Sequence, residues 1–165
     1  MEVTQGLSRQ LEEAIRRSNT VIYRRGRSIL AEMGISNPQF NALLTLNEFG
    51  PLTMGELCKH LLTACSTATD LADRLERDGL VERVRDSKDR RIVRMHMLSK
   101  GEDVVELVIS ERRRFLDKVL LEFKSEEQAQ ALESFELLAD RMECLDKDHP
   151  VQFVEVKDIK KRVNF

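Results

Sequence analysis

The chain has 165 residues, of which 41% are hydrophobic and 34% are charged, and its formal net charge is −2 at pH 7. This composition suits one compact helical domain, or one small domain with helical extensions. No stretch approaches the ~20 consecutive apolar residues of a membrane span, and the polar N-terminus lacks the apolar segment of a signal peptide. Because three widely spaced cysteines also argue against a disulfide scaffold, we expect a cytoplasmic protein that does not enter a membrane.

The first predicted element is a long helix over residues 7–33, whose apolar residues recur near one face. Gly34 follows this helix at the position where a left-handed residue often ends one. Ser36 has a glutamine three residues later, which is the capping-box pattern of a helix start. The second predicted helix therefore begins there, and Gly50 followed by a proline ends it.

Two short predicted helices come next. Thr53 and Glu56 repeat the capping-box pattern for a helix within residues 52–61. The following helix, over residues 66–76, has apolar residues at i, i+3, i+4 and i+7 and a polar opposite face. A helix, a tight connection and a second helix form the motif that places side chains in the major groove of DNA.

Residues 80–85 and 92–98 alternate and are rich in β-branched side chains, which predicts a β-hairpin with a polar tip at residues 86–91. Residues 83–94 carry six basic and two acidic side chains, a local charge of +4. The first helix adds five arginines without an acid over residues 16–27, and these either contact flanking phosphates or only solvate the helix. A basic surface on an acidic body is compatible with DNA binding.

Two more helices are predicted near the C-terminus. Ser99, with Glu102, opens a helix of about 25 residues, and Ser125, with Gln128, opens the last helix. The first and last helices carry more apolar surface than a DNA-binding core of roughly 50 residues can cover, so we expect this surplus to be buried in a homodimer. The tail over residues 146–165 has no assigned structure.

From these residues the chain resembles the MarR family of bacterial transcriptional regulators over residues 7–145. The resemblance rests on three motifs, LERDGLVER at residues 75–83, DSKDRR at 86–91 and LSKG at 98–101. It implies a mainly all-α fold with a small β-hairpin wing, in which a winged helix-turn-helix (52–98) is flanked by dimerisation helices (7–33 and 100–145) within one domain (1–145).

The resemblance also implies that the fourth helix reads the major groove and that the wing reaches the minor groove. Carried over by position, the DNA-binding residues are Ser66, Thr67, Thr69, Asp70, Arg74, Lys88, Asp89, Arg90 and Arg91. Among them, Arg91 is the minor-groove residue and Asp89 is the acid that orients the wing arginines. Lys88 departs from the family pattern Asp-x-Arg-Asp-x-Arg, because it keeps the charge but loses the bidentate guanidinium.

Three further departures concern the helix-turn-helix. Leu62 and Ala64 stand where the family often has a turn glycine and a capping serine, so the corner is expected to be looser or to be capped by Thr63 instead. Asp70 stands where a basic residue is frequent. A carboxylate there cannot hold a phosphate but can accept a hydrogen bond from a cytosine amino group.

These observations predict a sequence-specific transcriptional regulator that binds double-stranded DNA at a pseudo-palindromic operator. By family resemblance it is a repressor released by a small phenolic or aromatic effector, with Tyr23 and Arg16 as candidate effector contacts. The sequence offers no catalytic constellation, no cofactor motif and no metal-ligand spacing among its three histidines.

Two alternatives remain open at this point. The first is a redox-responsive regulator that uses Cys65 or Cys144, because the start of a helix, where Cys65 lies, favours a negatively charged sulfur. The second is a winged-helix module that contacts other proteins and does not bind DNA. Cys58, on the third predicted helix, is expected to lie in the core.

Overall fold

The computed structural model describes residues 2–148, with side chains for residues 6–147, so most of the predicted tail lies outside the described residues. The chain divides into two compact units, and the boundary lies between residues 117 and 118. Within the described part, no helix is long and apolar enough to cross a membrane.

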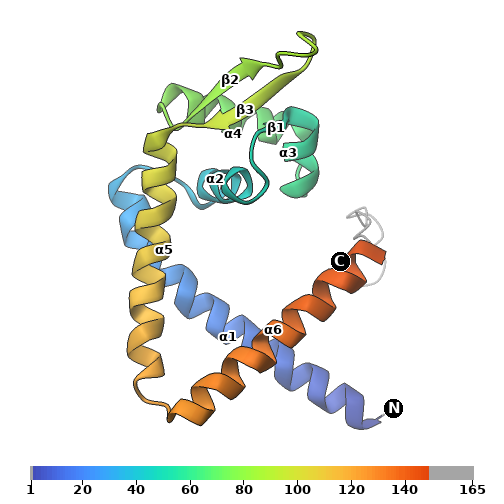
Figure 1. Ribbon diagram of the computed structural model, residues 1–165, viewed down its shortest axis with the longest axis vertical. Coiled ribbons are helices and arrows are strands. Elements are labelled where there is room, and N and C mark those ends of the chain that lie inside the picture. The colour runs from blue at the N-terminus through green and yellow to red at the C-terminus, as the bar shows by residue number, and fades with distance from the viewer. Residues whose placement is uncertain (1, 149–165) are drawn as a thin grey trace, which may run out of the picture. The chain divides into compact units, whose positions relative to one another are not determined.

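The first unit begins with two helices, α1 (Glu2–Glu32) and α2 (Asn37–Phe49) (Figure 1). As predicted, Gly34 takes a left-handed φ of +68° after α1. The predicted capping box at Ser36 is confirmed, because its hydroxyl accepts from the N–H of Gln39 and the Gln39 side chain accepts from the N–H of Ser36. These local signals fix the end of α1 and the start of α2, although α1 begins five residues earlier than predicted.

The helix-turn-helix consists of α3 (Met54–His60) and α4 (Cys65–Arg77). The capping box of Thr53 and Glu56 starts α3 as predicted. At the corner, Leu62 has a φ of +48°, the left-handed conformation that a glycine would adopt more easily. The N-cap of α4 is Ala64 and not Thr63, and Ala64 provides no side-chain hydrogen bond.

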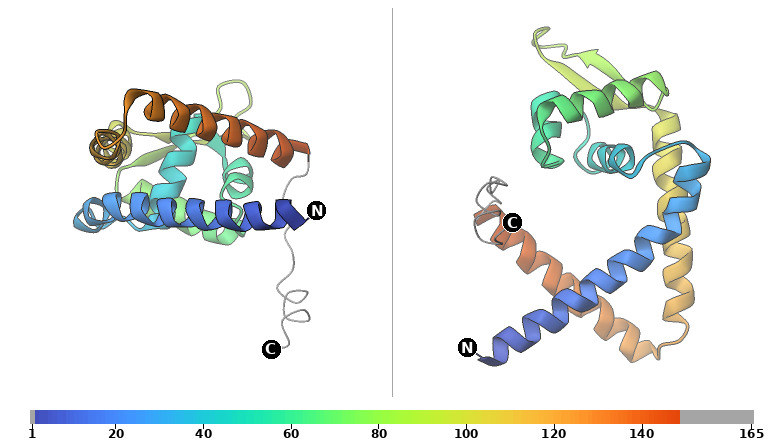
Figure 2. Two further views of the ribbon diagram at one scale, coloured as in Figure 1. Left: turned by 90° about the horizontal axis from the view of Figure 1, so that it is seen from below. Right: turned by 180° about the vertical axis from the view of Figure 1, so that it is seen from behind.

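Three antiparallel strands in the order β1-β3-β2 form the wing sheet: β1 (Leu52–Thr53), β2 (Val81–Arg85) and β3 (Val93–Met97). The predicted hairpin is confirmed, and its tip extends beyond the helices of the first unit (Figure 2). Strand β1 was not predicted, since residues 52–53 were assigned to the third helix. It forms by pairing with β3, more than forty residues later in the chain.

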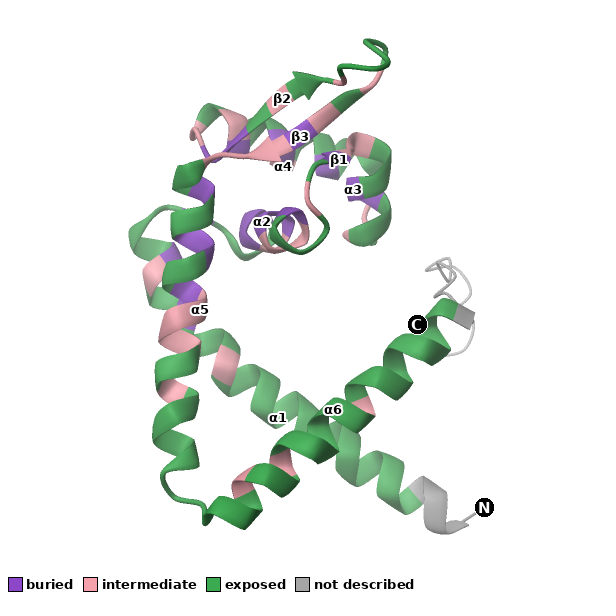
Figure 3. Cartoon of the chain, in the orientation of Figure 1, coloured by how far each residue is buried: buried purple, intermediate pink, exposed green. Residues whose placement is uncertain are grey.

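The core of the first unit lies where α2, α4 and the sheet meet the first turns of α5 (Ser99–Leu120) (Figure 3). Phe40 and Leu43 of α2, Leu75 of α4 and Val104 of α5 are among its fully buried residues. Gly101 lets α5 approach the sheet, because a Cβ there would collide with the carbonyl oxygen of Leu80. Burial of these apolar side chains supplies the main driving force that holds the helix-turn-helix and the wing sheet together.

Both predicted serine caps of the last two helices are placed one residue too late. Helix α5 begins at Ser99 itself, while the residue before α6 (Ser125–Asp148) is Lys124. The N–H of Lys124 donates to Glu127 Oε2 at 2.8 Å, and its carbonyl accepts from the N–H of Gln128. Lys124 is therefore the N-cap, and Glu127 takes the place predicted for Gln128.

Helix α6 exposes its apolar residues. None of its described residues is buried. The large hydrophobic residues that α6 exposes are Leu132, Phe135, Leu137, Met142 and Leu145. In the first unit, α1 exposes Leu7, Leu11 and Ile15. Each unit thus carries apolar helix surface that the described chain leaves in contact with solvent.

Candidate nucleic-acid interface

Helix α4 presents a polar, exposed face away from the core. Its buried residues are Ala68, Ala72 and Leu75, which share one side of the helix. All five residues predicted to read DNA from α4 are exposed: Ser66, Thr67, Thr69, Asp70 and Arg74. The Thr69 hydroxyl donates to the carbonyl oxygen of Cys65 at 2.8 Å, which leaves its lone pairs as acceptors.

An ion-pair cluster fastens α4 to the wing. The guanidinium of Arg83 on β2 donates to the carboxylates of Asp73 and Glu76 on α4, and the Arg83 N–H donates to Glu76 at 3.2 Å. The hydrogen bond to Asp73 is the main cause that raises the pKa of Arg83, and Glu76 adds to it. Because the Arg83 side chain is half-buried, this cluster fixes the wing relative to α4.

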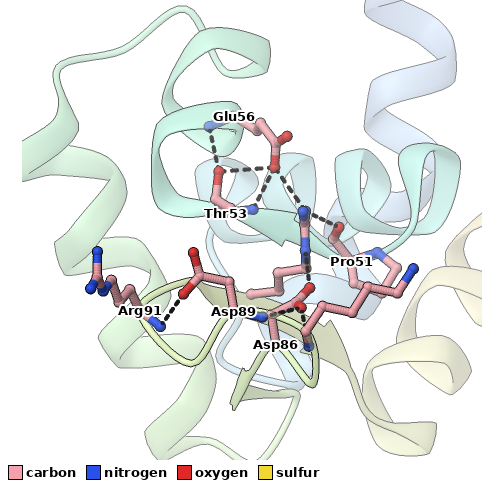
Figure 4. A network of polar contacts seen from close by, with 8 residues as sticks. Pro51, Thr53, Glu56, Asp86, Asp89 and Arg91 are labelled. Atoms are coloured by element: carbon pink, nitrogen blue, oxygen red, sulfur yellow. Dashed lines mark hydrogen bonds and ion pairs between the residues drawn. The ribbon is translucent and has the colours of Figure 1, made fainter.

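A second cluster joins the wing tip to the start of α3 (Figure 4). The guanidinium of Arg94 on β3 donates to Glu56 Oε2 at 3.2 Å, to Asp86 Oδ2 at 3.3 Å and to the carbonyl of Pro51 at 3.4 Å. Glu56 Oε2 also accepts from the N–H of Thr53 at 2.7 Å. One arginine thus bridges the capping box of α3 and the first residue of the wing tip.

Hydrogen bonds hold the carboxylates of this cluster in their ionised form. Backbone N–H groups of Lys88 and Asp89 donate to Asp86 Oδ1 at 2.8 and 3.2 Å. These two bonds, and then the Arg94 side chain, lower the pKa of Asp86. The pKa of Glu56 is lowered chiefly by the N–H and hydroxyl of Thr53. The wing tip is therefore an ordered turn around Asp86 at neutral pH.

Asp89 contacts a wing arginine through the main chain. Its Oδ1 accepts from the backbone N–H of Arg91 at 3.0 Å (Figure 4). An ion pair between an acid of the tip and an arginine of the wing joins Asp86 to Arg94. Asp89 thus shapes the backbone that carries Arg91, while Asp86 orients a guanidinium.

Fewer basic side chains of the wing are free to face a partner than the sequence count suggests. Of the six basic residues in 83–94, Arg83 and Arg94 have carboxylate partners. The other four are exposed, namely Arg85, Lys88, Arg90 and Arg91. Arg83 and Arg94 were expected in the basic surface, and their role in positioning it was not predicted, because their partners are set by strand register and helix packing.

The cysteines divide between core and surface. Cys58 is buried, as predicted, while Cys65 and Cys144 are exposed, and all three are free thiols. Among residues 2–148 no cluster of three histidine, cysteine or acidic side chains could hold a metal ion.

Together, α4 and the wing present a polar helix face beside a cationic hairpin. This combination suits the grooves of DNA.

Comparison with known proteins agrees with this geometry. The model of the MarR family matches residues 35–93. The HTH-type transcriptional regulator YsmB of Bacillus subtilis is 43% identical over 119 residues, which cover 72% of this chain and 82% of YsmB. The transcriptional repressor MdtR of the same organism is 28% identical and matches over 73% of this chain and 77% of its own.

Solved structures give the same result. A MarR family protein from Bacillus stearothermophilus is 43% identical and superimposes with a TM-score of 0.75, covering 84% of this chain and 96% of its own. The MepR–DNA complex of S. aureus, at 21% identity, a TM-score of 0.63 and coverage of 79% and 98%, shares the fold.

Proposed function

This chain belongs to the MarR family of DNA-binding helix-turn-helix transcriptional regulators, and from that premise we propose that it is a homodimeric repressor released by a small aromatic effector. The observation that carries the proposal is the joining of α4 and the wing by Arg83, which presents an exposed polar helix and an exposed cationic tip as one body. Membership of a DNA-binding family argues against a winged helix used only for protein contact.

In the proposed complex, α4 enters the major groove and the wing tip follows the adjacent minor groove. Ser66, Thr67, Thr69, Asp70 and Arg74 contact bases or phosphates from α4, and Lys88, Asp89, Arg90 and Arg91 act at the wing. The short hydroxyl side chains support close approach of the helix to the DNA. An inserted Arg91 guanidinium gains most where a narrow A·T-rich minor groove concentrates negative potential.

The wing provides the direct test. Arg91→Ala should weaken operator binding by about 1–3 kcal/mol, with the largest loss on A·T-rich flanks. Lys88→Ala should cost less and should act equally on all sequences, as a phosphate contact does. Fluorescence anisotropy on operators that differ only in their flanks measures both effects. Unchanged binding by the Arg91→Ala protein would contradict the minor-groove role.

The Asp89→Ala variant separates a positioning role of Asp89 from the effect of its negative charge. If Asp89 shapes the backbone at Arg91 through its 3.0 Å hydrogen bond, removal of this acid should weaken DNA binding. A simple charge count expects the opposite, because the substitution removes a negative charge near the phosphates. Tighter binding by this variant in the same anisotropy assay would refute the positioning role.

Homodimerisation is proposed from the apolar surface that the described helices expose. Leu7 and Leu11 of α1 and Phe135 and Leu145 of α6 are between 40% and 62% exposed. Each of the two helices thus exposes large apolar side chains, which is a sign of an interaction surface. Equilibrium sedimentation at micromolar concentration should give twice the chain mass, and a species of 19.1 kDa would overturn the proposal. Deletion of residues 126–165 should abolish the dimer.

An effector is proposed from a pocket on the first unit. Asn19, Thr20, Tyr23, Arg24, Arg27 and Asn37 line a cavity of about 510 Å³. Tyr23 gives this lining an aromatic ring, and Arg24 and Arg27 give it two cationic side chains. This cationic, partly aromatic surface favours an aromatic acid. The predicted contact Arg16 does not line it and is paired with Glu12.

Calorimetric titration with 2-hydroxybenzoate tests whether this pocket binds an aromatic acid. The binding constant should fall in an Arg27→Ala variant and stay unchanged in Arg17→Ala, because Arg17 lies on the same helix outside the lining. Addition of the compound should release the wild-type protein from DNA. Equal binding by both variants would show that this pocket is not the site.

A further inference from the structure

Helix α4 carries three acids, and one of them is left without a basic partner. The guanidinium of Arg83 binds two of them, Asp73 and Glu76. Among the described residues, the carboxylate of Asp70 has neither an ion pair nor a hydrogen bond. A lone carboxylate on a surface that approaches phosphates lowers DNA affinity unless it meets a hydrogen-bond donor there.

Arg74 is the matching cation on the same face of α4. The other arginine of this helix, Arg77, has its Nε 3.7 Å from Asp78, whereas Arg74 has no carboxylate partner in the described part of the chain. Asp70 and Arg74 are both exposed and lie four residues apart, so their side chains project from one side of the helix. They are not paired with each other, and both charges are therefore available to a ligand.

The place of Asp70 on α4 favours contact with base edges over contact with phosphates. Ala68, Ala72 and Leu75 form the buried side of α4, and at 3.6 residues per turn Asp70 lies on the opposite side. A recognition helix in the major groove turns its core-facing side away from the bases. Asp70 would then stand at the centre of the side that faces the bases, where a carboxylate needs a donor.

We propose that Asp70 selects a cytosine and Arg74 selects a guanine in each operator half-site. This inference rests on the proposed DNA-binding function. In the major groove, cytosine presents the N4 amino donor, whereas guanine and thymine present only hydrogen-bond acceptors. Adenine places its N7 acceptor beside its N6 donor, which disfavours a carboxylate. Because a carboxylate only accepts hydrogen bonds, cytosine satisfies Asp70 best.

The guanidinium of Arg74 matches the two acceptors of guanine, N7 and O6, which a planar fork binds together. Four residues of helix advance about 6 Å along the axis, and stacked base pairs are about 3.4 Å apart. The cytosine and the guanine should therefore lie within about two base pairs of each other. This spacing gives the half-site a sequence that the exposure of α4 alone does not predict.

A substitution at Asp70 should change which base is preferred. Selection from random duplexes with the full chain gives the operator, and fluorescence anisotropy gives the affinity for its variants. The wild-type protein should bind about tenfold more weakly when the cytosine is replaced by adenine, with its pair. The Asp70→Asn protein should instead prefer adenine, because an amide donates to N7 and accepts from N6. An unchanged preference for cytosine in Asp70→Asn would overturn the inference.

Arg74 is tested by removal of a single base atom. In 7-deazaguanine the base pair is kept but the N7 acceptor is lost. The wild-type protein should bind this operator about tenfold more weakly, whereas Arg74→Ala should bind the normal and the modified operator equally. A similar loss in both proteins would show that another residue reads this guanine and would overturn the role of Arg74.

A charge control separates base selection from surface charge. Asp103→Asn removes an exposed acid of α5 and should keep the base preferences of the wild type. Equally tighter binding of Asp70→Asn to all operators would show that Asp70 acts only through its charge, and would overturn the inference. If the wild-type protein and Asp70→Asn select the same operator, the inference fails while the proposed function stands. If the wild-type protein enriches no sequence, the proposed function fails and the inference fails with it.

Discussion

Replacement of Arg83 by glutamine should uncouple α4, the proposed recognition helix, from the wing without removing a proposed DNA contact. In the native protein the Arg83 guanidinium on β2 reaches Asp73 and Glu76 on α4, and its side chain is 29% exposed. The substitution removes this positive charge from between two carboxylates. Both carboxylates then lie unpaired on the surface that we assign to DNA, where they repel phosphates.

The expected loss of stability is small because solvent screens the pairs. The partner side chains are 57% exposed for Asp73 and 38% for Glu76. Exposed pairs are worth roughly 0.2–1 kcal/mol each, so the free energy of unfolding should fall by about 1 kcal/mol. DNA affinity should fall by more, about 1–2 kcal/mol, because the wing loses its fixed position and two negative charges face the DNA.

Two measurements decide this prediction. Urea denaturation gives the change in stability, with Arg77→Gln as control, because Arg77 Nε lies 3.7 Å from Asp78 on a side chain that is 73% exposed. Anisotropy across a salt series gives the affinity and its salt slope. The slope should fall by less in Arg83→Gln than on loss of the Lys88 charge, which should reduce it by about 1. A slope reduced by about 1 or more in Arg83→Gln would show that Arg83 touches phosphate and would refute the reasoning.

Three other predictions concern stability. The raised pKa of Cys58 predicts that stability falls as pH rises between the ordinary pKa of 9.0 and about 11, because the thiol ionises in the unfolded chain before it does in the folded protein. Thermal melts should show this loss, and Cys58→Ala should remove it. The pKa of Asp86 is lowered in the folded protein, so Asp86 stabilises the fold above its unfolded pKa, and this stabilisation is lost as pH falls through its folded pKa. Acid titration of the Asp86→Asn protein should lack that loss of stability. Gly101→Ala should cost about 1–3 kcal/mol in urea because its Cβ meets the Leu80 carbonyl, whereas Gly55→Ala, with open space, should stabilise α3 by about 0.5–1 kcal/mol; equal effects would contradict the packing.

Structural features that depend on residues close together in the sequence could be predicted from it. The capping boxes at Ser36 and Thr53 and the left-handed Gly34 involve groups no more than three residues apart, so the sequence pattern carries the signal. The hairpin follows from alternation around a polar tip. Strand β1 could not be recognised, because two residues become a strand only through pairing with β3. The caps at α5 and α6 were misplaced because a serine also fits the first helical position.

The candidate site could also be predicted only in part. Helical periodicity separates the exposed face of α4 from Ala68, Ala72 and Leu75, so the exposure of the predicted contact residues follows from spacing alone. The pairing of Arg83 and of Arg94 with acids depends on strand register and on how α4 packs against β2, which residue counts do not contain. The left-handed corner at Leu62 likewise could not be predicted, because a leucine gives no turn signal.

The most direct test of the central claim is selection of bound fragments from a pool of random DNA duplexes by the purified, reduced protein. A homodimer that reads DNA with two α4 helices should enrich an inverted repeat whose half-sites lie about one helical turn, ~10 base pairs, apart. The enriched sequence should also carry A·T-rich segments where the two wings lie. Recovery of unenriched DNA, or of a single half-site without a symmetric partner, would contradict the account.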